Sequence, residues 1–220
     1  MISHAAKLEI CFGFQIKVLS LSMLLSNFGS GKVEAGCDEA GRGPLAGPVV
    51  ASAVILPADY QNELLNDSKQ LKRSHREALE IQIKAEALAW AVCEVSPEEI
   101  DEINILNASF LAMHRSVDQL KIKPELLLID GNRFKKYQSI PHECIVKGDG
   151  KYLSIAAASI LAKVERDRIM TQAAQQYPGY GWENNAGYPT MKHRQAIRDL
   201  GITPLHRKSF RLLPEQMELF

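Results

Sequence analysis

Two apolar segments close together near the N-terminus constrain the fold most. The first, VEAGCDE, covers residues 33–39, and the second, PVVASAVILP, covers residues 48–57. Between them lies AGRGPLAG, whose glycines and proline are typical of a tight loop. Because so short a connection joins antiparallel neighbours, the two segments predict adjacent strands of one β-sheet.

Strands and helices alternate along the rest of the chain. The longest expected helical stretch starts with Ser96 as N-cap, Pro97 at the first helical position and Glu99 three residues after the cap, and it breaks near Asn104. Short turns join the first expected strands, and longer crossovers join the later ones. This order predicts an α/β fold with a central mixed sheet flanked by helices and a C-terminal helical region. The further expected elements are strands at 89–95, 124–130 and 142–147, and helices in the second half of 66–87, at 154–177 and at 190–201.

The overall composition excludes several classes of protein. Acidic and basic residues are equal in number, at 26 each, so net charge indicates no partner. The four cysteines are scattered without a CxxC pair, which argues against a zinc site and fits a reducing, cytoplasmic location. No apolar run is long enough to span a membrane, and no heptad pattern or large apolar stretch demands a partner chain, so we expect a monomer.

The first residues differ in character from the rest. The stretch IKVLSLSMLLSNF is interrupted by Lys17 and three serines, and neither end has the marks of a signal peptide. Met23 leads smoothly into the first strand, so residues 1–22 are interpreted as an extension. We therefore divide the chain into an extension at 1–30, a main domain at 31–213 that includes the C-terminal helices, and a tail at 214–220.

Acidic residues stand at the ends of three expected strands. They are Asp38 with Glu39, then Asp130, then Asp149, and each is followed closely by a glycine. Ligands gather at adjacent strand ends in α/β sheets, and four carboxylates there would repel one another without a cation. Oxygen ligands favour Mn²⁺ or Mg²⁺, and two such ions can clamp a phosphodiester.

Two observations speak against this interpretation. Neighbours on a regular strand point to opposite faces, so Asp38 and Glu39 share a site only where the strand twists, bulges or ends. Asp before Gly is also a common turn pair, so each acid taken alone fits a turn residue. The joint pattern and the unusual DEAGRG segment favour the metal site.

The chain resembles bacterial ribonuclease HII, the type 2 ribonuclease H family. The resemblance runs from about residue 34 to 210 and rests on the ordered motifs DEAGRGPLAGPVVASAVIL, DSKQL, IDGNR, KGDGKYLSIAAASILAKVERDR, YGW…GYPT…H and HRKSF. It implies a ribonuclease H-like fold and endonucleolytic cutting of the RNA strand of RNA–DNA hybrids. It also implies nicking on the 5′ side of ribonucleotides embedded in duplex DNA, with two-metal-ion catalysis that leaves 5′-phosphate and 3′-hydroxyl ends.

The resemblance also assigns roles to residues. The family's four catalytic, metal-binding acids fall on Asp38, Glu39, Asp130 and Asp149, with Mn²⁺ or Mg²⁺ as cofactor and Asp38 placed between the ions. Its substrate-binding residues fall on Gly41, Arg42 and Gly43, whose loop detects the 2′-hydroxyl, and on Tyr188, which stacks on the sugar. Arg42 and Tyr188 also fit a solvated turn arginine and a core tyrosine. Lys69 is expected to contact a phosphate.

Further basic residues are open to two interpretations. Lys163, Arg166 and Arg168 lie at helical spacing and fit either a phosphate contact or a solvated face, with Asp167 as an ion-pair partner. His193 and His206 lack partners at ligand spacing, which favours structural or phosphate-contacting roles. Many relatives carry a basic KHKGY where this chain has Asn184-Asn185-Ala186, which puts substrate affinity in doubt. The cations that suit a duplex backbone near the C-terminus are Lys192, Arg194, Arg198, Arg207, Lys208 and Arg211.

Two short motifs in the sequence resemble known binding motifs, and two other classes of protein fit parts of the pattern. Gly29-Ser30-Gly31-Lys32 lacks the first glycine and the final Ser or Thr of a P-loop and is rejected as one. The tail Gln216–Phe220 resembles the bacterial sliding-clamp-binding peptide, and a tail folded onto the domain is the alternative. The rivals are an exonuclease or junction resolvase of related fold and a metal-free nucleic-acid-binding module.

Overall fold

The structure is a computed structural model that describes residues 24–67 and 71–214. Within these residues five strands form one sheet in the order β3-β2-β1-β4-β5. The β1–β2 and β2–β3 pairs are antiparallel, and the β1–β4 and β4–β5 pairs are parallel, so the expected mixed sheet is confirmed. The strands are β1 Glu34–Ala40, β2 Val49–Ile55, β3 Ala89–Val95, β4 Leu126–Asp130 and β5 His142–Ile145.

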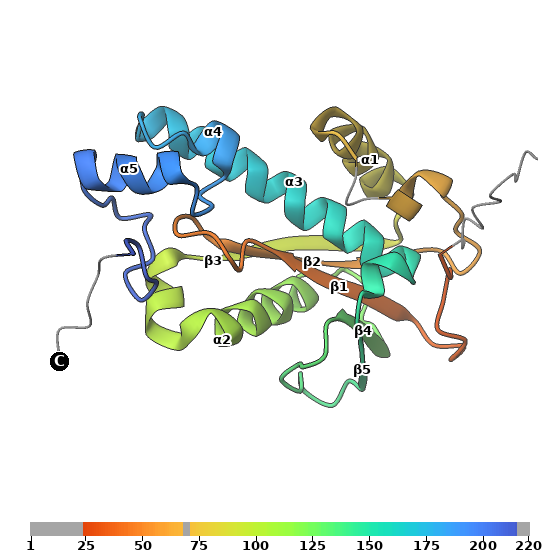
Figure 1. The fold of residues 1–220 in the computed structure, drawn as a ribbon. Helices are drawn as coiled ribbons and strands as arrows, with labels where there is room; N and C mark the ends of the chain where they lie inside the picture. Colours follow the sequence, from red (N-terminus) through yellow and green to blue (C-terminus); the bar gives the residue numbers. More distant parts are fainter. Residues whose placement is uncertain (1–23, 68–70, 215–220) are drawn as a thin grey trace, which may run out of the picture.

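Helices cover both faces of the sheet. Figure 1 shows α1 and α3 on one face and α2 on the other, with α4 and α5 beyond one end of the sheet. Within the described residues the helices and the sheet bury one apolar core between the sheet and α2 and another between the sheet, α1 and α3, and a further cluster joins α3, α4 and α5. The helices are η1 Glu63–Asp67, α1 Arg73–Glu86, α2 Pro97–Asp118, η2 Gly148–Gly150, α3 Leu153–Gln176, α4 Trp182–Asn185 and α5 Met191–Leu200.

The central helix α3 lies directly on β1. A Cβ atom added to Gly36 would come within 2.3 Å of the Ser154 carbonyl carbon and 2.4 Å of the Ile155 backbone nitrogen. Small side chains at Ala156, Ala157 and Ala158, all buried, keep this part of the helix narrow. The absence of a side chain at Gly36 therefore sets the distance between helix and sheet.

Helix α2 begins and bends as the sequence predicts. The Ser96 hydroxyl accepts a hydrogen bond from the Glu99 N–H at 3.2 Å, and the Glu99 carboxylate accepts one from the Ser96 N–H at 3.0 Å. This reciprocal pair is the capping box. Asn104 has non-helical angles, with φ 63°, and its side chain accepts bonds from the N–H groups of Leu106 and Asn107, starting the second part of the helix. The predicted break near Asn104 is confirmed.

The segment before β1 packs against the start of α3. Leu24 is 8% exposed, and Leu25 forms backbone hydrogen bonds with Lys151 and Leu153 at 2.8 and 2.9 Å. The rings of Phe28 and Tyr152 lie 5.9 Å apart. These contacts move the proposed start of the folded unit from residue 31 to Leu24, because backbone pairing at Leu25 holds this segment against the domain.

Some sequence-based predictions fall outside the described residues. These are the extension at 1–22, Lys69 and the tail peptide Gln216–Phe220. Among the helices that the structure does describe, none combines the length and the apolar character that a bilayer crossing requires.

Candidate active site

Two of the predicted acids stand side by side at the ends of neighbouring strands. The parallel register pairs Cys37 with Ile129, so Asp38 and Asp130 occupy the next matched position of β1 and β4. Alternation along β1 places Asp38 on the face of Gly36, which is the face that α3 covers. Asp38 is 6% exposed. The sheet register therefore brings these two carboxyl groups together, as expected.

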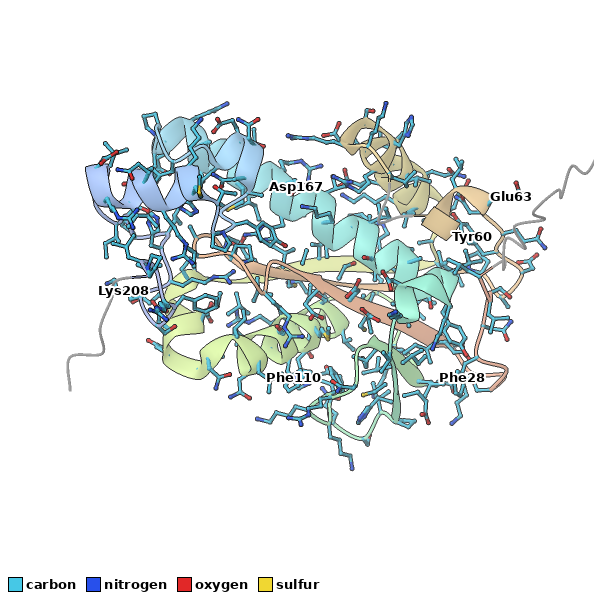
Figure 2. The ribbon with its side chains drawn as sticks, viewed as in Figure 1. Phe28, Tyr60, Glu63, Phe110, Asp167 and Lys208 are labelled. Atoms are coloured by element: carbon cyan, nitrogen blue, oxygen red, sulfur yellow. The ribbon has the colours of Figure 1, made fainter. Side chains whose placement is uncertain are left out.

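Glu39 reaches the same place from the other face. It alternates with Asp38 and belongs with Cys37 to the side that α2 covers. Because β1 ends one residue later, at Ala40, its side chain lies at the edge of the sheet. It lines a hollow shared with Ser159 of α3 and a second hollow shared with Phe110 of α2, a residue labelled in Figure 2. The difficulty raised by strand alternation is thus resolved by the strand's end.

The electrostatics of these acids favour a cation. The pKa of Asp38 is raised well above its ordinary value, first by burial and then by the charges of Glu39 and Asp130, against hydrogen bonds from Ser159 and the Glu39 N–H. Burial also raises the pKa of Glu39, although the Arg42 guanidinium at 3.1 Å opposes the rise. The ionised carboxylates of Asp38, Glu39 and Asp130 repel one another, so a bound cation would stabilise their charged forms.

The fourth acid lies off the sheet. The pattern predicts that Asp149 follows a strand directly, but β5 ends at Ile145 and Asp149 lies in the short helix η2. This part of the expectation is wrong, because the chain turns at Lys147, which has φ 57°. The preceding Gly148 N–H donates to Asp130 Oδ1 at 2.7 Å, so the backbone beside Asp149 is held at the end of β4. Asp149 is itself buried, at 4% exposed.

The donor set suits hard divalent ions by its chemistry. Every candidate ligand is a carboxylate oxygen, the donor that Mg²⁺ and Mn²⁺ prefer. No group of three or more acid, histidine or cysteine side chains in the described ranges is arranged ready to coordinate a metal. In this arrangement the Asp38 and Asp130 carboxylates accept backbone N–H bonds and Glu39 pairs with Arg42. The fit therefore rests on donor type and charge.

The Gly-Arg-Gly loop forms one wall of the larger hollow, of about 410 Å³. Gly41, Arg42, Gly43 and Tyr188 all line it, opposite Lys163 of α3. Gly41 has φ +98°, a conformation that favours glycine, and a Cβ on Gly43 would lie 3.6 Å from Tyr188 Cε1. Tyr188 is 44% exposed, so it is not a core residue. The structure thus brings together the loop and the tyrosine that the resemblance assigned to substrate binding.

The cations of α3 divide into distinct roles. The Asp167 carboxylate, on the residue labelled in Figure 2, pairs with Lys163 at 2.6 Å and Arg76 at 3.5 Å, so its prediction as an ion-pair partner is confirmed. Arg168 is exposed and pairs with Glu80 at 2.8 Å. The Arg166 side chain is 1% exposed, so neither a solvated face nor a phosphate contact describes it.

Three residues near the C-terminus that were predicted to contact a phosphate or to be structural are buried. Arg207 is fully buried, so its expected contact with a duplex backbone is wrong. His193 and His206 are also buried, with their Nε2 atoms 3.3 Å apart and the Trp182 indole N–H donating to His193 at 3.0 Å. Burial lowers the pKa of His206 to about 4. The two histidines therefore have the structural role.

Sequence reasoning missed part of the lining. The second hollow, of about 290 Å³, contains Asn132 and Arg133 beside Asp130 and Glu39, and the first contains Arg76 and Ser159. Asn132 and Arg133 directly follow the acid in IDGNR, a signal that was available in the sequence. Arg76 and Ser159 carried no such signal, since they reach the site only through the packing of α1 and α3.

Carboxylates at adjacent strand ends on this helix-flanked mixed sheet define a ribonuclease H-like protein. The family model for Ribonuclease HII matches residues 35–213, and the chain belongs to that family. A Ribonuclease HII of Phocaeicola vulgatus is 66% identical over 197 residues, which cover 90% of this chain and 98% of that protein. One from Christiangramia forsetii is 57% identical over 194 residues, 88% of this chain and 98% of its own length.

Solved structures agree with this assignment. The ribonuclease H2 of Pyrococcus horikoshii OT3 superposes with a TM-score of 0.68 at 29% identity, covering 81% of this chain and 94% of its own. The RNase HII in the PCNA:RNase HII complex of Archaeoglobus fulgidus superposes with a TM-score of 0.67 at 27% identity, covering 84% and 98%. The chain is therefore a ribonuclease H, a hydrolase of RNA–DNA hybrids from a family that depends on divalent metal ions.

Proposed function

We propose that this ribonuclease H also nicks duplex DNA on the 5′ side of single embedded ribonucleotides, leaving 3′-hydroxyl and 5′-phosphate ends. The observation that carries the proposal is the hollow in which Gly43 and Tyr188 stand beside Glu39. A ribonucleotide in DNA differs from its neighbours only by one 2′-hydroxyl, which both donates and accepts hydrogen bonds. The backbone groups of the Gly41–Gly43 loop can reach such a hydroxyl without side chains in the way.

The acids Asp38, Glu39, Asp130 and Asp149 are proposed as the ligands of two divalent ions, Mn²⁺ or Mg²⁺. Bound ions supply an activated water and stabilise the charge that develops on the leaving 3′ oxygen. Asp38 is more deeply buried than Glu39 or Asp130, and the charges of both raise its pKa. We therefore assign it the position between the ions.

The residues around the acids then hold the substrate. Arg42 lies at the rim of both hollows, and Arg133 extends the positive surface past Asp130. Cationic side chains on both sides of the carboxylates suit a polynucleotide that passes across them. Tyr188 presents an exposed ring next to Gly43, where a sugar would lie. Lys69, outside the described residues, is proposed as a further phosphate contact.

A cleavage assay with three duplexes tests the proposal. The substrates are a continuous RNA–DNA hybrid, a DNA duplex with one ribonucleotide, and an all-DNA duplex as control. In Mn²⁺ or Mg²⁺ we expect cutting of the first two and a single nick 5′ of the lone ribonucleotide, with no cutting in EDTA. If the enzyme cuts the continuous hybrid but does not nick the duplex with one ribonucleotide, its activity is limited to hybrids and the proposal is wrong. Degradation from an end of the all-DNA duplex would instead favour an exonuclease.

The tail peptide Gln216–Phe220 is proposed to bind the bacterial sliding clamp. The Archaeoglobus fulgidus neighbour in complex with PCNA supports this, since PCNA is a sliding clamp. A short peptide with an apolar end suits a groove on a partner. Ending the chain after Pro214 should remove clamp capture in a pull-down while hybrid cleavage continues unchanged. Undiminished capture by the shortened chain would overturn this role.

Two further properties stay predictions. We expect the enzyme to work in the cytoplasm and to be a monomer. Cell fractionation measures the first, and light scattering of the purified chain measures the second.

A further inference from the structure

Two arginine side chains are buried beside the Gly-Arg-Gly loop. Arg166 of α3 is 1% exposed and Arg207 is 0% exposed. Within the described part of the chain neither guanidinium forms an ion pair, and their N–H groups donate to backbone carbonyl oxygens. Burial lowers the pKa of Arg166 to about 10 and of Arg207 to about 9, so both stay charged at neutral pH. A buried charge of this kind is tolerated only where its hydrogen bonds are satisfied.

The Arg207 side chain donates hydrogen bonds to four backbone carbonyls of the loop. Its Nη2 donates to Gly41 O at 2.6 Å and its Nη1 to Arg42 O at 3.0 Å and Pro44 O at 2.9 Å. Its Nε donates to Gly47 O at 2.9 Å. A planar guanidinium has five N–H donors in fixed directions, which lets one side chain meet four carbonyls at once.

Arg166 ties the same loop to the segment that carries Tyr188. Its Nε donates to Pro48 O at 3.1 Å, and its Nη1 donates to Ala186 O at 3.0 Å. It also packs against Gly41, where an added Cβ would lie 2.0 Å from the Arg166 Nε. Arg166 therefore contacts both parts of the proposed sugar-binding wall.

The direction of these carbonyls decides the direction of the loop's N–H groups. In a trans peptide the C=O and N–H of one unit point to opposite sides. The Gly41 carbonyl shares its peptide with the Arg42 N–H, and the Arg42 carbonyl shares its peptide with the Gly43 N–H. Since both carbonyls point to Arg207, both N–H groups point away from it. Arg42 and Gly43 are exposed and line the hollow beside Tyr188.

We propose that Arg207 and Arg166 are positioning residues that present the N–H groups of Arg42 and Gly43 to the substrate's 2′-hydroxyl and hold Tyr188 in register with them. This inference rests on the proposed function. Neither arginine touches the substrate, and each acts through the backbone of the loop. For this role the planar arrangement of N–H donors in the Arg207 guanidinium matters more than its charge, because four backbone carbonyls must be held in one orientation.

Replacing each arginine with lysine tests the inference. R207K and R166K keep the charge but supply three donors from one point, which cannot hold all the carbonyls. We expect kcat on a duplex with one ribonucleotide to fall about tenfold or more for each variant, with KM changed less than threefold, because small misplacements of a site are costly. The assays run well below each variant's melting midpoint, and R115K is the control, since Arg115 pairs with Glu99 at a distance from the loop.

The outcomes separate the two proposals. If wild-type protein does not nick the duplex with one ribonucleotide, the proposed function fails, whether or not it cuts the continuous hybrid. If wild type cuts and the folded lysine variants keep kcat within twofold, the positioning role is overturned. If R207K does not fold, R166K decides alone. If neither variant folds while R115K does, the two arginines serve stability only, and the inference is likewise wrong.

Discussion

Replacing Asp38 with asparagine is expected to abolish cleavage and to leave binding of an RNA–DNA hybrid nearly unchanged. Asparagine has the same shape but lacks the charge that a cation needs, and Asp38 is the acid most strongly coupled to its neighbours. We expect a rate loss on the order of 10³-fold or more, or about 4 kcal/mol in activation free energy. Single-turnover cleavage in Mn²⁺ and a binding titration in EDTA measure the two effects. D199N is the control, since Asp199 is exposed on α5.

The same substitution should stabilise the protein in metal-free buffer. The pKa of Asp38 is higher in the folded chain than in the unfolded chain, so the folded state binds its proton more tightly. Stability therefore falls as pH rises through the interval between these two pKa values, and at pH 7 the ionised group is destabilising. D38N removes that charge, and its melting temperature at pH 7 in EDTA should exceed that of wild type. Retained cleavage or a lower melting temperature would contradict the role given to Asp38.

Replacing Gly36 with alanine should lower the free energy of unfolding by about 3 kcal/mol. The added Cβ would approach the α3 backbone at Ser154 and Ile155, and neither backbone can move without shifting the helix from the sheet. In a chain of this size the loss corresponds to a fall in melting temperature of roughly 10 °C. Thermal unfolding followed by circular dichroism measures it.

Gly150 offers a matched control for that experiment. A Cβ added there meets no atom within 4 Å, and its φ is not in the left-handed region. G150A should therefore melt close to wild type. If G36A and wild type have the same melting temperature, α3 can move away from β1 without loss of stability, and the prediction is wrong.

The elements that sequence reasoning recovered are those with local signals. The strand at 89–95 and the capping box at Ser96 depend on neighbouring residues only, and both are found as expected. Asn104 breaks its helix because its own side chain caps the next turn. Asp38 and Asp130 lie together because each stands at the end of its strand, a local feature, and the parallel register of β1 and β4 then aligns the two ends.

The features that were missed depend on distant contacts. Helical spacing of Lys163, Arg166 and Arg168 does not say which of them faces a loop that lies 120 residues earlier. Arg207 looked like one more surface cation, because its four acceptors belong to another part of the chain. The turn at Lys147 that carries Asp149 off the sheet and the short helix at Trp182–Asn185 have too few residues for a periodic pattern.

The hydrogen bond between Arg207 and Gly41 joins residues 166 positions apart. During synthesis the sheet's first hairpin and α3 leave the ribosome well before Arg207 does, and chain segments can begin to fold in that order. The loop at Gly41 would then carry its carbonyls without their final partner until Arg207 emerges. A nascent chain with its carboxylates in place thus acquires the oriented loop only after Arg207 has been synthesised, so the proposed recognition of ribose would form later than the cluster of acids.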